Sequence, residues 1–109
     1  MARKLSILIV DDEESVRDSL YNWFIEDGYH VECAESAMSA LKMLESESFD
    51  IILADIKMPG MDGLEMLKRI KLIKADSIVI MMTAFATVDT AVQALKDGAF
   101  DYVTKPFDP

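Results

Sequence analysis

The chain has 109 residues, a length suited to one domain with one core, and residues 1–109 are treated as a single domain. Eleven Lys and Arg residues oppose twenty Asp and Glu residues, and the resulting net charge of −9 argues against direct nucleic-acid binding by this segment. The short apolar run near the start ends in four acidic residues and is neither a signal peptide nor a membrane span, while the single cysteine, Cys33, cannot form an internal disulfide and fits a reducing cytoplasm.

Short apolar runs alternate along the chain with segments of helical periodicity. Runs typical of strands occupy residues 5–10, 29–34, 51–54, 77–82 and 101–104. Between them, apolar residues recur at helical spacing in four groups: Val16, Leu20, Trp23 and Phe24; Ala37, Ala40, Leu41 and Leu44; Leu64, Leu67 and Ile70; and Val88, Ala91, Val92 and Leu95. Gly28 and Gly98 each follow a predicted helix and precede a predicted strand, where a left-handed helix cap is expected.

This alternation predicts an α/β fold with a parallel five-stranded sheet and helices on both faces. Because the crossovers between parallel strands are right-handed, few strand orders remain. The doubly wound, flavodoxin-like order 2-1-3-4-5 suits a chain whose first strand is strongly apolar and therefore central. In such a sheet, ligands bind beyond the carboxyl ends of the strands.

Polar residues stand at the ends of four predicted strands. Asp11 and Asp12 follow the first, Asp55 the third, Thr83 the fourth and Lys105 the fifth. Two carboxylates about 4 Å apart repel by about 4 kcal/mol at an effective dielectric constant near 20. Three converging acids therefore take up protons or bind a cation, and oxygen ligands with open positions suit Mg²⁺.

A phosphoryl-transfer site accounts for the whole group. Mg²⁺ would neutralise an incoming phosphoryl group, Asp55 would attack as a nucleophile, and Thr83 and Lys105 would bind the remaining phosphoryl oxygens. Taken singly, the residues have simpler explanations: acids favour a helix start, Thr83 suits a strand end or cap, and Lys105 suits a solvated loop. Tyr102 on its own is most simply a half-buried strand aromatic. The specific signal is their coincidence at one predicted edge of the sheet.

Four segments resemble the receiver domain of bacterial two-component response regulators: "ILIVDDEES", "DIILADIKMPGMDGLEML", "IVIMMTAFA" and "GAFDYVTKPF". Within that family they are most similar to receivers of nitrogen-regulatory-type, sigma-factor-dependent transcription activators. The resemblance implies a cytoplasmic signalling switch, not a classical enzyme, which accepts a phosphoryl group on Asp55 from a sensor histidine kinase. The other implied partners are a downstream, transcriptional effector domain and a second copy of the chain.

The resemblance also assigns roles to individual residues. It implies that Mg²⁺, with Mn²⁺ as the alternative, is bound directly by Asp12, through water by Asp11, and by Asp55 and the backbone carbonyl of Lys57. Lys105 becomes the phosphate-binding lysine, and the peptide bond that joins it to Pro106 is expected to be cis. Thr83 and Tyr102 match the switch pair: phosphorylation is expected to draw Thr83 inward and to let Tyr102 rotate from an exposed to a buried position.

One departure from the family concerns the end of the chain. A receiver has a fifth helix after the fifth strand, whereas this sequence stops at "KPFDP", so we expect a domain truncated before its last helix. The missing helix would pack beside the first one. Without that helix, apolar side chains of residues 51–54 and 77–82 are expected to lie uncovered, which predicts marginal stability or self-association.

Two alternatives from other functional classes remain at this point. A structural or dimerisation module with an inactive acidic pocket would keep the same fold without the chemistry. A phosphatase of the haloacid-dehalogenase type would need a second acid two residues after the nucleophile, and Asp55 is followed by Ile56 and Lys57.

Overall fold

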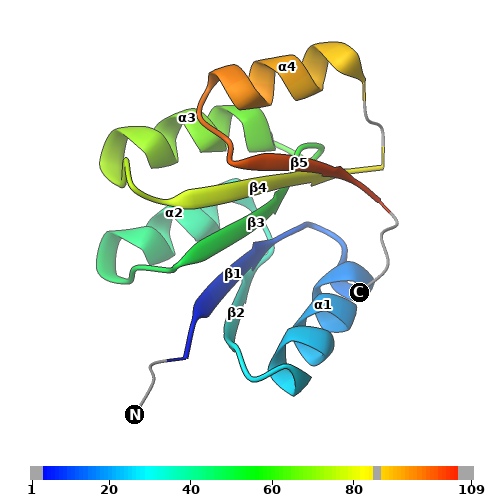
Figure 1. Ribbon diagram of the computed structural model, residues 1–109, viewed down its shortest axis with the longest axis vertical. Helices are drawn as coiled ribbons and strands as arrows, with labels where there is room; N and C mark the ends of the chain where they lie inside the picture. The colour runs from blue at the N-terminus through cyan, green and yellow to red at the C-terminus, as the bar shows by residue number, and fades with distance from the viewer. Residues whose placement is uncertain (1–3, 85–86, 106–109) are drawn as a thin grey trace.

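The structure is a computed structural model that describes residues 4–84 and 87–105. Strands and helices alternate within these ranges in the order β1 (Ser6–Val10), α1 (Glu14–Glu26), β2 (His30–Ala34), α2 (Ala37–Ser46), β3 (Ile51–Asp55), α3 (Gly63–Ile73), β4 (Ile78–Thr83), α4 (Val88–Lys96) and β5 (Asp101–Thr104). The strands form one parallel sheet in the order β2-β1-β3-β4-β5 (Figure 1). This confirms the predicted fold class and strand order, and every strand lies within one residue of its predicted bounds.

The apolar character of β1 explains its central place. Leu8, Ile9 and Val10 are fully buried, because both faces of this strand are covered. In the sheet, Ile9 lies opposite Cys33 of β2 on one side and Leu53 of β3 on the other. The carboxyl ends of β1 and β3 are therefore neighbours, at the point where the direction of strand addition reverses.

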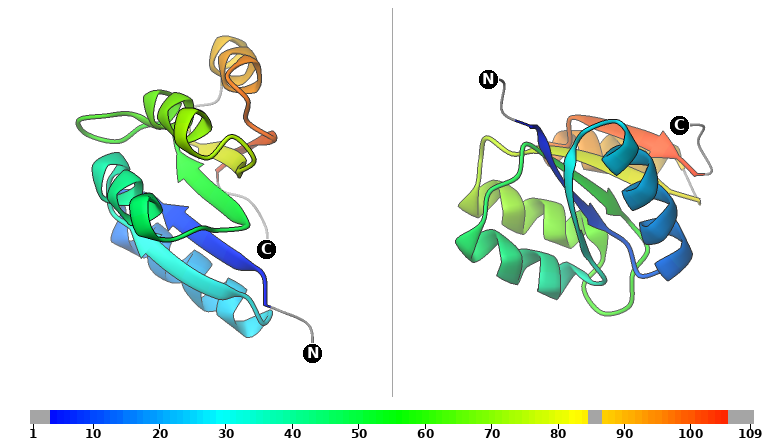
Figure 2. Two further views of the ribbon diagram at one scale, coloured as in Figure 1. Left: turned by 90° about the vertical axis from the view of Figure 1, so that its left-hand side faces the viewer. Right: turned by 90° about the horizontal axis from the view of Figure 1, so that it is seen from below.

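The helices are divided unequally between the two faces of the sheet (Figures 1 and 2). On one face, buried side chains of α2, α3 and α4 join those of the strands, among them Leu44, Leu67 and Ala94. On the other face, α1 packs Leu20 against a smaller group of buried strand residues. The helix-spaced apolar residues of the sequence mark the buried sides of α1, α2 and α3. In α4 the expectation is wrong for Val88, Val92 and Leu95, which are exposed, and Ala94 is the buried residue.

Capping residues fix where the helices begin and end. Ser36 and Thr87 each form a reciprocal capping box, at the starts of α2 and α4, and Asp62 caps α3. Gly28 and Gly98 have φ angles of 92° and 104°, which confirms the predicted left-handed caps. None of the helices in the described ranges combines the length and the apolar character that a membrane crossing requires.

An apolar groove of about 400 Å³ runs along the α1 face of the sheet. It is lined by Ile7, Trp23, Phe24, Tyr29, Ile51, Leu53, Ile80 and Val103. Strand residues that the sequence led us to expect on an uncovered face, such as Ile51 and Ile80, are indeed only half-buried. The segment that would cover them stays a prediction.

Candidate functional site

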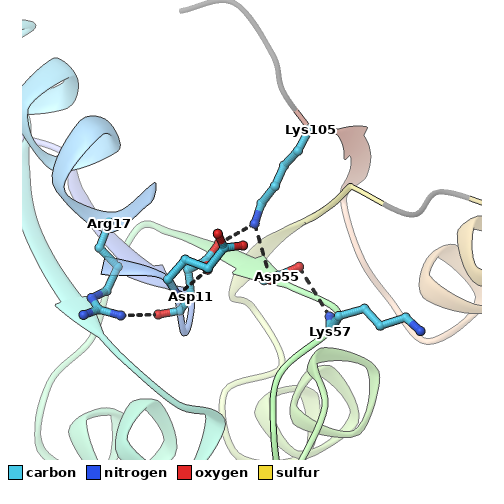
Figure 3. Close-up of polar contacts among 6 residues, drawn as sticks. Asp11, Arg17, Asp55, Lys57 and Lys105 are labelled. Carbon is cyan, nitrogen blue, oxygen red and sulfur yellow. Dashed lines mark hydrogen bonds and ion pairs between the residues drawn. The ribbon is translucent and has the colours of Figure 1, made fainter. Parts of the chain in front are cut away.

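The polar residues predicted at the strand ends meet at one edge of the sheet. Asp11 and Lys105 directly follow β1 and β5, and Asp55 and Thr83 are the last residues of β3 and β4. One carboxylate oxygen from each of Asp11, Asp12 and Asp55 lies within 4.8 Å of the other two. The Lys105 ammonium reaches into the same cluster (Figure 3). The sheet therefore brings together residues that are up to 94 positions apart.

Asp11 is the most firmly positioned acid of the cluster. Its side chain is completely buried, one oxygen accepts the Glu13 N–H at 2.9 Å, and the other accepts the Lys105 ammonium at 2.6 Å. The backbone carbonyl of Asp11 also accepts a hydrogen bond from the Arg17 guanidinium at 2.8 Å (Figure 3). Asp12, the next residue, is exposed at the mouth of the site. The turn after β1 thus separates one buried carboxylate from one that is open to a ligand.

Asp55 sits at the buried tip of β3, with 4% of its surface exposed. Oδ1 accepts the Lys57 N–H at 3.3 Å, and Oδ2 lies 3.3 Å from the Lys105 ammonium. Burial raises the pKa of the Asp55 carboxyl, Lys105 opposes this rise, and the charge of Asp11 adds to it. A further positive charge nearby, such as a bound cation, would therefore stabilise the ionised form of Asp55.

Close backbone packing fixes the loop behind Asp55. The Gly63 N–H, at the start of α3, donates to the Ile56 carbonyl at 2.8 Å. A Cβ atom at residue 63 would lie 2.1 Å from the Asp55 carbonyl oxygen, so only glycine fits here. The glycine that ends "MPGMDG" thus lets α3 begin directly against the last residue of β3.

Lys105 balances part of the negative charge. Burial lowers the pKa of its ammonium, but hydrogen bonding to Asp11 and the charges of Asp11 and Asp55 outweigh this, so the pKa lies above its usual value. The lysine is therefore charged throughout the physiological pH range. With all four side chains ionised, three carboxylates and one ammonium leave two net negative charges, which a divalent cation would neutralise.

The donor atoms in the cluster are those of a hard-cation site. All three acidic ligands are carboxylates, and one of them is exposed. Lys57 follows Asp55 by two residues, and its N–H contact turns the loop around that carboxylate, which places its backbone beside the site (Figure 3). This set fits Mg²⁺, which takes a few oxygen ligands from protein and keeps positions for water or phosphate oxygens.

Thr83 and Tyr102, the predicted switch pair, lie on the neighbouring strands β4 and β5. Thr83 is buried at the end of β4, and its carbonyl accepts the Lys105 N–H at 2.7 Å. Tyr102 is half-buried, as expected of a strand aromatic, because its ring packs against the core on the α4 side of the sheet. Its rotation on phosphorylation stays a prediction. Its hydroxyl lies 2.7 Å from the Thr90 Oγ1. The prediction of a cis bond before Pro106 concerns a residue outside the described ranges.

Sequence reasoning missed two polar residues near this site. Arg17 holds the Asp11 carbonyl, and Thr90 contacts the Tyr102 hydroxyl. The place of Arg17 in the sequence could have indicated its contact, because it lies in the first turn of α1, shortly after the acidic residues that follow β1. Thr90 had a signal for helix capping, as the second threonine of "TVDT", but none for its contact with Tyr102.

Comparison with known proteins identifies a family for this geometry. Residues 7–109 match the family described as "Response regulator receiver domain". The regulatory protein AtoC of Escherichia coli strain K12 is 48% identical over 102 residues, which cover 94% of this chain and 22% of that protein. The DNA-binding transcriptional regulator NtrC of Proteus hauseri is 44% identical over 106 residues, covering 97% of this chain and 22% of that protein. The chain thus spans about a fifth of the length of these relatives.

Solved structures agree with this match. A CheY-like response regulator receiver domain protein from Methanospirillum hungatei JF-1 superposes with a TM-score of 0.95 and 36% identity over 98% of this chain and 86% of that one. A response regulator from Burkholderia pseudomallei, solved with a phosphorylated aspartic acid, a calcium ion and citrate, gives a TM-score of 0.91 and 31% identity over 96% of this chain and 62% of that one.

Proposed function

Because the chain belongs to the response regulator receiver domain family, we propose that it is a phosphorylation-dependent signalling switch in which Asp55 accepts the phosphoryl group. The observation that carries the proposal is the place of Asp55. It is a nearly buried carboxylate at a strand tip, with an ammonium 3.3 Å away and two further carboxylates beside it. A nucleophile, a cation for the phosphoryl oxygens and ligands for a metal ion thus meet at one point.

The transfer is a substitution at phosphorus. One Asp55 oxygen attacks the phosphorus of a phosphohistidine on a sensor kinase, and an O–P bond forms as the P–N bond breaks. The electron pair of the broken bond remains on the imidazole nitrogen, and the product is an acyl phosphate. The domain contributes the nucleophile and the positioning groups for its own phosphorylation and dephosphorylation, as a signalling domain and not a classical enzyme.

The side chains around Asp55 have separate tasks in this step. The Lys105 ammonium, already 3.3 Å from Asp55, would donate to a phosphoryl oxygen, and the buried Thr83 at the neighbouring strand end would bind another. Mg²⁺, or Mn²⁺ in its place, would be held by Asp12, Asp11, Asp55 and the Lys57 carbonyl, and would supply charge neutralisation for the phosphoryl oxygens.

The partners belong to the same proposal. The donor would be a sensor histidine kinase, and the receiver would control a transcriptional effector joined to it, as the names of the similar regulators suggest. A receiver domain named NtrC4, 41% identical to this chain, was solved as a beryllofluoride-activated dimer, which supports a homodimer as the active form. The half-buried free thiol of Cys33 is consistent with a reducing cytoplasm.

Intact-mass measurement after incubation with acetyl phosphate and Mg²⁺ tests the proposal. We expect the wild-type chain to gain one phosphoryl group and Asp55→Asn to gain none. Asp62→Asn is the matched control, because it makes the same change in the same loop and asparagine also caps a helix. A wild-type chain that gains no phosphoryl group would favour the alternative of a structural module with an inactive pocket.

A further inference from the structure

A hydrogen bond joins α4 to β5 away from the acidic cluster. The Tyr102 hydroxyl and the Thr90 Oγ1 are 2.7 Å apart, and both residues are half-buried. Tyr102 lies on β5 opposite Met81 of β4, two residues before Thr83 at the site. Thr90 lies in the first turn of α4, which runs beside β5 (Figure 1). This contact therefore connects β5, three residues before Lys105, with the beginning of α4.

Thr90 also completes the cap of α4. Thr87 is the N-cap, and its Oγ1 accepts the Thr90 N–H at 3.1 Å. In return, the Thr90 Oγ1 accepts the Thr87 N–H at 3.3 Å and lies 3.1 Å from the Thr87 carbonyl oxygen. The third position of a capping box is usually glutamate or glutamine. A threonine here keeps the polar atom close to the helix, within reach of Tyr102.

Several partners share the Thr90 hydroxyl. A threonine hydroxyl has one proton and two acceptor positions. Its oxygen lies within hydrogen-bond distance of the Thr87 N–H, the Thr87 carbonyl oxygen, the Thr87 Oγ1 and the Tyr102 hydroxyl. The contact with Tyr102, at 2.7 Å, is the shortest of the four, and either hydroxyl can be its donor. Tyr102 is therefore a main partner of the Thr90 hydroxyl, beside the cap of α4.

The hydrogen bond between Tyr102 and Thr90 is present together with the direct contact, at 3.3 Å, between the Asp55 carboxylate and the Lys105 ammonium. We propose that Thr90 is a positioning residue for Tyr102: its hydroxyl holds the tyrosine against the first turn of α4 until phosphorylation moves Thr83 and Tyr102 leaves. This inference rests on the proposed function for the event that releases Tyr102, while the hydrogen bond itself is a property of the free protein. Departure of Tyr102 removes one partner of the Thr90 hydroxyl, which belongs to the capping box of α4, so the start of this helix responds to the site.

Tyrosine-selective NMR of the whole chain tests this assignment. The chain has three tyrosines, and Tyr102→Phe identifies the Tyr102 ring signals. These signals are recorded for the wild type, Thr90→Val and Thr90→Ser, each free and with beryllofluoride and Mg²⁺ as a phosphoryl analogue. Thr87→Val is the control for fraying of α4, since it removes the other hydroxyl of the cap and leaves Thr90 in place. Thr90→Ala is a second variant without the hydroxyl, in case valine disturbs the fold.

In the free protein we expect Thr90→Val and Thr90→Ala to move the Tyr102 signals towards their beryllofluoride positions. The ratio of the two Tyr102 conformers should change by roughly two- to tenfold, the effect of one net hydrogen bond. Thr90→Ser should retain the wild-type signals, and Thr87→Val should shift them by much less than Thr90→Val does. Rescue by serine would show that the hydroxyl, and not the shape of the side chain, holds Tyr102.

Two results would overturn the inference: Tyr102 signals of the free Thr90→Val and Thr90→Ala variants that coincide with the wild type, or an equal displacement in Thr87→Val. A wild type that does not respond to beryllofluoride would instead count against the proposed function. In that case, the difference between the valine and serine variants of the free protein still decides the role of Thr90.

Discussion

The Lys105 ammonium lies 2.6 Å from Asp11, a completely buried carboxylate that is 94 residues away in the sequence. The same nitrogen lies 3.3 Å from Asp55. One cation therefore serves two buried acids, and a third acid, Asp12, stands at the rim. The fold therefore places more negative than positive charge in this cluster. The effect of this imbalance on stability and on metal binding can be measured without a phosphodonor.

Asp55→Asn should stabilise the metal-free protein at neutral pH. Burial and the charge of Asp11 raise the pKa of the Asp55 carboxyl above its unfolded value, so the ionised form opposes folding. We expect the free energy of unfolding to rise by about 1–3 kcal/mol in urea titrations with a chelator present.

The pH dependence of this gain follows from the raised pKa. Protonation of Asp55 favours the folded state, so this stabilising contribution is full below the unfolded pKa and is lost as the pH rises through the higher, folded pKa. The advantage of Asp55→Asn over the wild type should therefore shrink as the pH falls through that window. An advantage that stays constant, or grows, on acidification would contradict the assigned direction.

Mg²⁺ should raise the melting temperature of the wild type, because an ion that binds only the folded state stabilises it by mass action. At a concentration about 100 times the dissociation constant the gain is about 2.7 kcal/mol. Asp12→Ala should lose most of this response, and since Asp12 is exposed, its metal-free stability should change little. Glu14→Ala, an exposed acid in the first turn of α1, is the control and should respond like the wild type.

Gly63→Ala should destabilise the domain more than any ordinary surface change. The new methyl group would overlap the Asp55 carbonyl oxygen, so α3 or the tip of β3 must shift, at a cost of more than about 2 kcal/mol. Gly60→Ala is the comparison, because φ is 77° there but space is open, and about 1–2 kcal/mol of backbone strain is expected. Equal losses of stability in urea titrations would mean that the close approach at residue 63 relaxes without cost.

The apolar groove on the α1 face predicts a covering segment. We expect residues that follow Pro109 in a longer chain to form a helix beside α1 and to cover side chains such as Ile80 and Val103. Several hundred Å² of apolar surface at roughly 25 cal/mol per Å² corresponds to several kcal/mol, so the longer chain should melt at a higher temperature. A 109-residue chain that is monomeric by light scattering at high concentration, and melts no lower than the longer one, would count against this expectation.

The fold could be predicted from the sequence because the apolar strands and the alternation of strands with helices lead to the same topology, although the helical spacing did not identify the buried side of α4. Continuous apolar strands require cover on both faces, and right-handed crossovers then leave few strand orders. That order alone places Asp11, Asp55, Thr83 and Lys105 at one edge, so the candidate site followed from topology.

Side-chain direction could not be predicted in the same way. Asp11 and Asp12 are adjacent and chemically identical, yet one is buried and the other exposed, since the turn after β1 decides which carboxylate faces Lys105. Likewise, half-burial of Tyr102 agrees with an aromatic residue on a strand, but the partner of its hydroxyl was not predicted. Its contact with Thr90 depends on the distance between α4 and β5, which no residue pattern specifies.

Locating the phosphoryl group on the chain tests the central claim most directly. After incubation with acetyl phosphate and Mg²⁺, the acyl phosphate is reduced with borohydride, which converts a phosphorylated aspartate to homoserine. The protein is then digested and sequenced by mass spectrometry. We predict homoserine at position 55, dependent on Mg²⁺ and strongly reduced in Asp12→Ala. Homoserine at position 11 or 12 instead, or none in the wild type, would contradict the assignment of Asp55 as the phospho-acceptor.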